Sequence, residues 1–367
     1  MKEDFAQTPE TQLLEENDID HGRYAYIGLV GNYDDTDETR VLLTPEACGM
    51  LTSGGHVIAM EAGAGIDVSF SDESYAEYGV KIVTRDQALK ADLVLSYTPL
   101  RAADIRKMRP GAVLLCMMDT ELINPGIINA LLEQKVTMGC LDNMYSHNDE
   151  PVFANIIDEI DGRAAVMYAQ ENLSYLGGGK GVLLAGVAGI SPCEVLIFGE
   201  GVDVEAAATA SLAAGARVTV LNNDISALQR TQIACGPGIT TLAIHPRVLS
   251  NRVRSADVIF FGTTTRPFEM PRSLMATMKP NVFILDFKES HPAVSVPRTV
   301  AMAISNVLVN FFAEIMLKGN FEGMLTTSEG VQAGIVTYRG CLVDKLLGSY
   351  MGMPAVDISV MLAGSSN

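Results

Sequence analysis

The segment V-L-I-F-G-E-G-V-D-V-E-A-A-A-T-A (195–210) decides the fold. Its first four residues are apolar and predict a buried strand, and the glycines that follow predict a tight turn that opens a helix. This strand–turn–helix unit is typical of dinucleotide-binding domains, in which the first glycine permits the turn and the second lets the backbone approach the pyrophosphate. We therefore expect Gly199 and Gly201 to be cofactor-binding residues.

Two residues of this turn depart from the G-x-G-x-x-G pattern. Val204 replaces the third glycine, which would let helix and strand pack closely, and Asp203 lies in the first turn of the helix. A carboxylate there stabilises a helix by ~0.3–1 kcal/mol, but a pyrophosphate needs the same helix end. Two like charges ~5 Å apart repel by roughly 3 kcal/mol at an effective dielectric of 20, which is about two orders of magnitude in affinity. The turn predicts a Rossmann-like fold and leaves dinucleotide binding open.

The end of the following strand, V-T-V-L-N-N-D (218–224), holds the next candidate contact. An Asp or Glu about 20 residues after the glycines would hydrogen-bond the adenosine ribose, and Asn222 stands at that place. An asparagine can form one such bond, but it does not select NAD as a carboxylate does. Asn222 is therefore a candidate cofactor-binding residue, with Asp224 as an alternative.

Short apolar runs alternate with helix-patterned segments along most of the chain, which predicts parallel sheets covered by helices. The expected strands are 26–30, 56–60, 93–96, 112–117, 136–139, 195–199, 218–222, 257–262 and 282–287. The expected helices include 45–53, 125–134, 155–176, 299–319 and 328–350.

The length of 367 residues suggests about two domains. We predict an α/β protein of two Rossmann-like domains with parallel sheets and a cleft between them. Residues 24–154 and 316–367 would form a substrate (catalytic) domain, 155–315 an NAD(P)-binding domain, and 1–23 an acidic N-terminal arm. Ligands of such folds bind at the carboxyl ends of the strands and between domains.

The composition argues against several classes of protein. The formal net charge of −18 disfavours nucleic acid and anionic membranes as partners. No apolar run reaches the roughly 18 residues that span a bilayer, and the acidic N-terminus is not a secretory signal. The cysteines and histidines form no zinc-binding pattern. We expect a cytoplasmic protein with reduced cysteines and no metal.

Several segments together resemble the alanine dehydrogenase family and the related N-terminal portion of transhydrogenase. They include R-V-L-L-T-P-E-A (40–47), D-E-I-D-G-R-A-A-V (158–166), G-K-G-V-L-L-A-G-V-A-G-I-S-P (179–192), M-K-P (278–280) and T-Y-R-G (337–340), in order and with the family's spacing. The resemblance implies an NAD-dependent oxidoreductase that interconverts L-alanine with pyruvate and ammonia. It also implies a small amino or keto acid as substrate and a homo-oligomer, either a hexamer or a dimer.

The resemblance further implies which residues stand at the catalytic positions. Arg40 matches the arginine that anchors the substrate carboxylate, a role that suits a bidentate guanidinium. No lysine occurs at 96–98, where the family has one near the substrate carbonyl. Asp119 replaces the histidine that acts as general acid and base, and Ser290 replaces the catalytic aspartate.

The cofactor positions have changed in the same way. Asp158 replaces a small serine near the cofactor phosphates, whereas Asn306 matches an asparagine at the nicotinamide end. Lys288, Glu289 and His291 are additional charged or titratable residues beside Ser290. If the strand at 282–287 continues, its alternation places Lys288 on the face that carries Asp286 and Ser290.

Three hypotheses follow. The chain is an active NAD-dependent alanine dehydrogenase, as the resemblance implies. Alternatively, it is a catalytically degenerate member with a binding or regulatory role and weak or no NAD binding, as the altered positions favour. A third hypothesis is an enzyme with a new constellation around Arg40, Asp119 and residues 288–291 that acts on another ligand.

Overall fold

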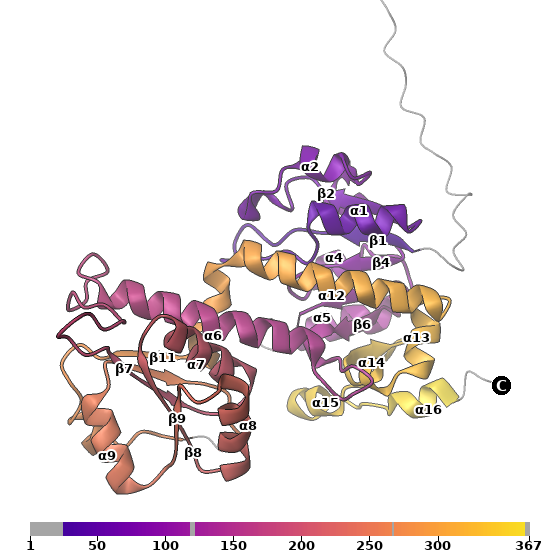
Figure 1. Cartoon of the computed structure of the whole chain (residues 1–367). Coiled ribbons are helices and arrows are strands. Elements are labelled where there is room, and N and C mark those ends of the chain that lie inside the picture. The colour runs from indigo at the N-terminus through magenta and orange to yellow at the C-terminus, as the bar shows by residue number, and fades with distance from the viewer. Residues whose placement is uncertain (1–24, 118–121, 266–267, 364–367) are drawn as a thin grey trace, which may run out of the picture.

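The computed structural model describes residues 25–117, 122–265 and 268–363, which form two α/β units side by side (Figure 1). The N-terminal arm and Asp119 lie outside the described residues. Each unit is built on its own sheet, and the two units follow each other along the chain except that the C-terminal segments return to the first sheet.

The first unit contains an eight-stranded sheet with the order β13-β12-β6-β5-β4-β1-β2-β3. Its strands are β1 (Tyr26–Leu29), β2 (Val57–Glu61), β3 (Lys81–Val83), β4 (Leu93–Leu95), β5 (Val113–Cys116), β6 (Thr137–Cys140), β12 (Ile335–Tyr338) and β13 (Cys341–Leu342). The strands β1 to β6 run parallel, whereas β12 is antiparallel to both β6 and β13.

Helices cover both faces of the first sheet. Its helical elements are α1 (Pro45–Ser53), η1 (Ile66–Val68), α2 (Asp72–Ala76), α3 (Arg85–Ala88), α4 (Ala102–Ile105), α5 (Pro125–Glu133), η2 (Leu141–Asn143), α12 (Pro297–Leu317), α13 (Phe321–Thr327), α14 (Glu329–Ala333), α15 (Lys345–Met351) and α16 (Ile358–Ala363). One core includes apolar residues of α1 and α12, and another includes residues of α3, α4 and α5.

The second unit contains a five-stranded, fully parallel sheet with the order β11-β10-β7-β8-β9. Its strands are β7 (Glu194–Phe198), β8 (Arg217–Asn222), β9 (Thr240–Ala243), β10 (Val258–Phe261) and β11 (Phe283–Asp286). Its helical elements are α6 (Val152–Leu173), α7 (Val202–Ala213), α8 (Ile225–Cys235), α9 (Pro246–Ser255), α10 (Arg272–Met275), α11 (Phe287–Ser290) and η3 (Pro292–Ser295). The predicted α/β class with two parallel-sheet units is confirmed.

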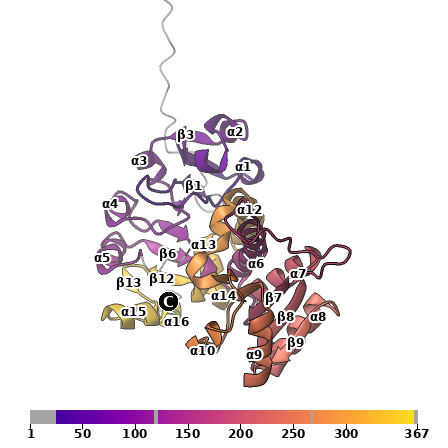
Figure 2. The same cartoon turned by 90° about the vertical axis from the view of Figure 1, so that its left-hand side faces the viewer.

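The long helices α6 and α12 connect the two units and lie side by side (Figure 2). Helix α6 also packs along α7, while α12 packs against α1 of the first unit. The predicted domain boundaries stay a prediction, although α12 belongs to the core of the first unit by its contacts. Helix α12 is also the one described helix that is long and apolar enough to cross a membrane. However, its Ile304, Leu308 and Phe312 side chains are 0% exposed, as expected for a core helix.

Several predicted elements are explained by their capping residues. Helix α1 spans the expected residues 45–53 because Pro45 occupies its first turn and the Thr44 side chain accepts a hydrogen bond from the Ala47 N–H. Helix α5 begins in the same way, after the side chain of Asn124. These local signals explain why sequence alone placed the two helices well.

The predicted helix at 328–350 is wrong, because this segment contains the hairpin of β12 and β13. Arg339 and Gly340 connect the two strands with φ values of 48° and 83°, the left-handed backbone of a tight two-residue hairpin turn. The predicted parallel sheet therefore ends in antiparallel strands. The short strands β3 and β9 were not predicted, because both are partly exposed and lack a strong apolar pattern.

Candidate functional site

A cavity of about 810 Å³ lies at the carboxyl ends of the first sheet's strands and extends to the second unit. Its walls come from loops that follow β1, β4, β5, β6 and β11, and from one face of α6. The lining residues are Glu38, Arg40, Tyr97, Thr98, Met117, Asp142, Ala154, Ile157, Asp158, Asp161, Lys288, Glu289 and His291. We call this space the cleft cavity. It is where ligands of parallel α/β folds usually bind.

Arg40 is held in the cleft cavity by Glu38. The Arg40 Nε and Nη2 atoms donate to the two carboxylate oxygens of Glu38 over 2.8 and 2.6 Å. Burial would lower the pKa of Arg40, but these hydrogen bonds, together with the nearby charges of Glu38, Tyr97 and Asp161, raise it. The pair occupies one edge of the guanidinium and leaves the Nη1 edge for a second carboxylate. The geometry therefore suits the predicted anchoring role of Arg40.

Tyr97 lies under the guanidinium of Arg40. The centre of its ring is 4.5 Å from the Arg40 Cζ atom, a cation–π contact that fixes the side chain from a second direction. Tyr97 is only 5% exposed, and burial raises the pKa of its hydroxyl above the usual value. Among the described residues its hydroxyl has no hydrogen-bond partner, although the residue lines the cleft cavity.

Helix α6 contributes two carboxylates, one helical turn apart, to the same cavity. Asp161 accepts a 2.6 Å hydrogen bond from the backbone N–H of Ala293, which ties α6 to η3. Asp158 has no partner within residues 25–117, 122–265 and 268–363. Burial, with repulsion from Asp203 and Asp161, raises the pKa of Asp158 to about 7. The predicted phosphate-contacting residue Asp158 therefore faces the cleft as a poorly neutralised acid.

The segment after β11 does not continue as a strand, so the predicted alternation of Lys288 with Asp286 and Ser290 is wrong. The Asp286 carboxylate accepts a hydrogen bond from the Lys288 N–H and caps the short helix α11. Lys288, Glu289 and His291 line the cleft cavity, whereas Ser290 is exposed and is not among its lining residues.

The glycines of the 199–201 turn adopt the backbone that the sequence predicts. Gly199 and Gly201 have φ values of 131° and 101°, which favour glycine, and α7 begins directly after them. Val204, which replaces the third glycine, is fully buried, and a Cβ atom at Gly262 would lie 2.4 Å from its side chain. The missing glycine of the turn is thus compensated by a glycine in the loop after β10.

The same turn is hydrogen-bonded to the loop after β10. The Glu200 N–H donates to the Thr263 carbonyl over 2.7 Å, and the Asp203 Oδ2 atom accepts from the Thr263 N–H over 2.6 Å. The other oxygen of Asp203 accepts from the Val204 N–H. Asp203 is 2% exposed, and burial raises its pKa despite these hydrogen bonds. An internal carboxylate therefore lies in the first turn of α7, where a pyrophosphate would be attracted, and accepts from one N–H of that helix and one N–H of the loop after β10.

Asn222, the predicted ribose contact, is hydrogen-bonded to other residues of the chain. The Asn222 amide donates to the Gly199 carbonyl over 2.9 Å and accepts from the Asp224 N–H over 2.9 Å, while Asp224 caps α8. The space beside Asn222 is a cavity of about 190 Å³, below the ~300–1,000 Å³ of typical ligand pockets. The Phe198 ring stacks on both Phe261 and Phe268 at this end of the sheet.

These contacts do not fit a bound dinucleotide. Asp203 supplies negative charge at the helix end where a pyrophosphate would be expected. The Glu200 side chain accepts a hydrogen bond from the Thr265 hydroxyl, and the Asn222 side chain is hydrogen-bonded to backbone groups. Asn306 is exposed on α12 and lines neither the cleft cavity nor the 190 Å³ cavity. The roles predicted for Gly199, Gly201, Asn222, Asp158 and Asn306 in NAD binding stay predictions.

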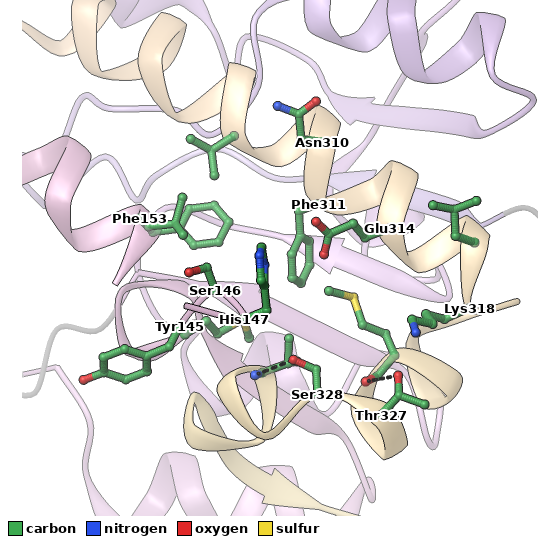
Figure 3. A pocket seen from close by; sticks show the side chains of 16 residues that line it. Tyr145, Ser146, His147, Phe153, Asn310, Phe311, Glu314, Lys318, Thr327 and Ser328 are labelled. Atoms are coloured by element: carbon green, nitrogen blue, oxygen red, sulfur yellow. Dashed lines mark hydrogen bonds between the residues drawn. The ribbon is translucent and has the colours of Figure 1, made fainter. Parts of the chain in front are cut away.

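A separate cavity of about 440 Å³ lies between α12, α13, α14 and the segment before α6 (Figure 3). Its lining includes the apolar residues Phe153, Phe311 and Met324 and the polar residues His147, Glu314 and Lys318. It contains none of the predicted site residues, so we place the candidate functional site in the cleft cavity.

Sequence reasoning missed one charged cluster, which explains two of the quoted motifs. Lys180 of G-K-G and Lys279 of M-K-P donate to the same Oδ1 atom of Asp257, over 2.6 and 3.0 Å. The second oxygen of Asp257 accepts from the Glu194 N–H at the start of β7. This cluster lies at the amino end of the second sheet, so these lysines support the fold rather than the cleft.

The sequence and structure match known proteins over most of their lengths. Residues 33–155 match the alanine dehydrogenase/PNT N-terminal domain, and residues 165–288 match its C-terminal domain. Alanine dehydrogenases of Mycolicibacterium smegmatis and Bacillus subtilis are each 26% identical, over 89% and 90% of this chain and 97% and 96% of theirs. A solved L-alanine dehydrogenase has a TM-score of 0.79 at 21% identity, covering 89% of this chain and 99% of its own. The two domain matches show that the chain belongs to the alanine dehydrogenase/PNT family.

Proposed function

We propose that this protein binds a small α-amino or α-keto acid in the cleft cavity and does not oxidise it with NAD. The protein would then have a binding or regulatory role. The observation that carries the proposal is the hydrogen bond between Asp203 and Thr263, which fixes a carboxylate at the start of α7, where a pyrophosphate would be expected to bind. The retained arginine in the cavity supports acid binding.

The residues of the cleft cavity suit a zwitterion. The free edge of the Arg40 guanidinium would bind the ligand carboxylate, with Glu38 holding the arginine in place. The Tyr97 hydroxyl would donate a further hydrogen bond to that carboxylate. Asp161, which is close enough to Arg40 to interact with its charge, would accept a hydrogen bond from the α-ammonium group of the ligand. A keto acid would make only the carboxylate contacts with Arg40 and Tyr97, so we expect amino acids to bind more tightly.

The test combines an assay with a titration. L-alanine and NAD, and separately pyruvate, ammonia and NADH, should give no change in NADH absorbance above the rate without protein. Calorimetry with L-amino acids should show saturable binding. Turnover at a rate typical of enzymes, ~1–1,000 per second, would overturn the proposal.

The second candidate function is NAD-dependent oxidation of L-alanine. The family assignment and the placement of Arg40 in the cleft cavity favour it. The same absorbance assay decides between the two candidates. Under either function we propose a homo-oligomer, a hexamer or a dimer, in the cytoplasm. Light scattering of the purified protein measures the oligomer, and a monomer would contradict this part.

A further inference from the structure

We propose that the cleft cavity prefers an α-amino acid whose side chain carries a second cation, such as lysine or ornithine, over neutral amino acids of the same length. This inference rests on the proposed function, because it names the class of amino acid that the same site takes. Three observations support it: the charge balance of the cleft cavity, two lining side chains without hydrogen-bond partners among the described residues, and the volume of the cavity.

The charge balance of the cavity is negative. Glu38 is already neutralised by Arg40 in their bidentate pair. Of the remaining lining residues, four are acidic and two are basic: Asp142, Asp158, Asp161 and Glu289 against Lys288 and His291. Asp142 has a further interaction within the chain, which leaves Asp158, Asp161 and Glu289 against Lys288 and His291. The carboxylate and α-ammonium groups of a neutral amino acid cancel each other's charge, so only a second cation on the ligand reduces this excess.

The contacts of the acids show where the second cation would lie. Asp161 is partly satisfied by the Ala293 N–H and lies close enough to Arg40 and His291 to interact with both charges. Asp158 stands one helical turn earlier on α6, towards its N-terminus, and has no partner in the described part of the chain. Buried charges are usually paired. An ammonium group at the end of a side chain would supply the missing partner of Asp158.

Tyr97 is an independent sign that the cavity holds a polar ligand. Its side chain is more than nine-tenths buried, yet its hydroxyl is without a partner among residues 25–117, 122–265 and 268–363. The hydroxyl is not among the fully enclosed polar atoms and is open to the cleft cavity, so a ligand there can form a hydrogen bond with it. Because the Tyr97 ring lies against the Arg40 guanidinium, a carboxylate bound to that guanidinium is within the same part of the cavity. The ligand would therefore have an acidic end at Arg40 and a cationic end at Asp158.

The size of the cavity fits a long side chain. A volume of about 810 Å³ exceeds what L-alanine could fill, and it lies within the ~300–1,000 Å³ of sites for larger ligands. The lining also includes the apolar residues Met117, Ala154 and Ile157, which can contact methylene groups between the two ends. A diamino acid combines these features, whereas a diamine lacks the carboxylate.

Binding should release a proton. Burial and the neighbouring acids raise the pKa of Asp158 to about 7, so this carboxyl is only partly ionised at neutral pH. A bound ammonium group favours the ionised form, and affinity should therefore rise from pH 6 to pH 8. The groups that face Asp158 from the surrounding elements are Glu38, Arg40, Tyr97, Asp142, Asp161, Asp203, Lys288, Glu289 and His291.

The experiment is calorimetric titration of the whole protein with L-lysine, L-norleucine and cadaverine at pH 8. Norleucine is lysine without the second amine, and cadaverine is lysine without the carboxylate. We expect lysine to bind at least tenfold more tightly than either, with a smaller advantage at pH 6. Asp158→Asn should remove most of the advantage over norleucine, while the matched charge change Glu171→Gln on the exposed end of α6 should preserve it.

The outcomes distinguish this inference from the proposed function on which it rests. Equal affinities for lysine and norleucine would overturn this inference and leave the proposed function standing. Equal affinities for lysine and cadaverine would show that Arg40 does not anchor the carboxylate. If no amino or keto acid binds, both the inference and the proposed function are wrong.

Discussion

The Asp203 carboxylate accepts a 2.6 Å hydrogen bond from the Thr263 N–H, and this bond joins the turn after β7 to the loop after β10. A second bond, from the Glu200 N–H to the Thr263 carbonyl, runs in the opposite direction between the same segments. The turn that would surround a pyrophosphate is therefore held by two hydrogen bonds to the loop after β10. The fold of the second unit therefore does not by itself imply that it binds the ligand usual for such folds.

Replacing Asp203 should increase the affinity for NADH. In Asp203→Ala the helix end loses a negative charge, which is worth up to ~3 kcal/mol against a phosphate at close range, and the Thr263 N–H becomes available. We expect NADH to bind at least tenfold more tightly than to the unmodified protein, measured by NADH fluorescence. Glu171→Gln is the control for net charge, and a melting curve confirms folding. Unchanged affinity in a folded Asp203→Ala variant would show that Asp203 does not block the turn.

Asp158→Asn should stabilise the protein at high pH. The folded-state pKa of Asp158, about 7, is above its unfolded value, so ionisation costs stability increasingly as the pH rises through the carboxyl range, up to about 7. After allowance for solvent screening we expect a gain of ~1–2 kcal/mol at pH 8 and a smaller gain at pH 5. Chemical denaturation at both pH values measures it. A loss of stability at pH 8 would mean that Asp158 has a stabilising partner.

Glu38→Gln should weaken the binding of amino acids. Glu38 fixes the guanidinium of Arg40 through two hydrogen bonds, and a neutral amide can accept only one of them well. We expect the affinity for the best-bound amino acid to fall about 5–20-fold, roughly 1–2 kcal/mol, in calorimetry. Tighter binding in this variant would instead identify Glu38 as a competitor of the ligand carboxylate.

Asp257→Asn should destabilise the second unit without changing the cleft. Asp257 accepts hydrogen bonds from two lysines and one backbone N–H, and its removal leaves Lys180 and Lys279 without their shared partner. We expect a loss of about 2–3 kcal/mol in the free energy of unfolding. Asp86→Asn, which breaks an exposed pair with Lys107, should cost no more than ~0.5 kcal/mol. Equal effects of the two substitutions would contradict the structural role of Asp257.

The sequence predicts those features that depend on neighbouring residues. The 199–201 turn, the caps of α1 and α5 and most strands follow from local glycine, proline and apolar patterns. The hairpin at Arg339 and Gly340 was missed, because a helical apolar pattern outweighed a two-residue turn signal. The helix α11 was missed for a similar reason, since one side-chain cap at Asp286 ends the strand.

The candidate site depends on contacts between distant segments, which one sequence does not reveal. Asp203 and Thr263 are 60 residues apart, and nothing in either segment predicts that they bond. The charge of Asp203 and its conflict with a pyrophosphate could be predicted, because they follow from its place in the helix. The placement of Tyr97 beneath Arg40 could not, because it depends on how the ends of β1 and β4 meet.

The most direct test of the account is calorimetric titration of the unmodified protein with NADH at neutral pH and moderate salt. Because Asp203 occupies the turn and Asp158 faces it from α6, the account predicts no saturable heat up to millimolar NADH, while an amino acid under the same conditions binds. Micromolar NADH binding would contradict the account, since the turn would then accommodate the pyrophosphate despite its own carboxylates.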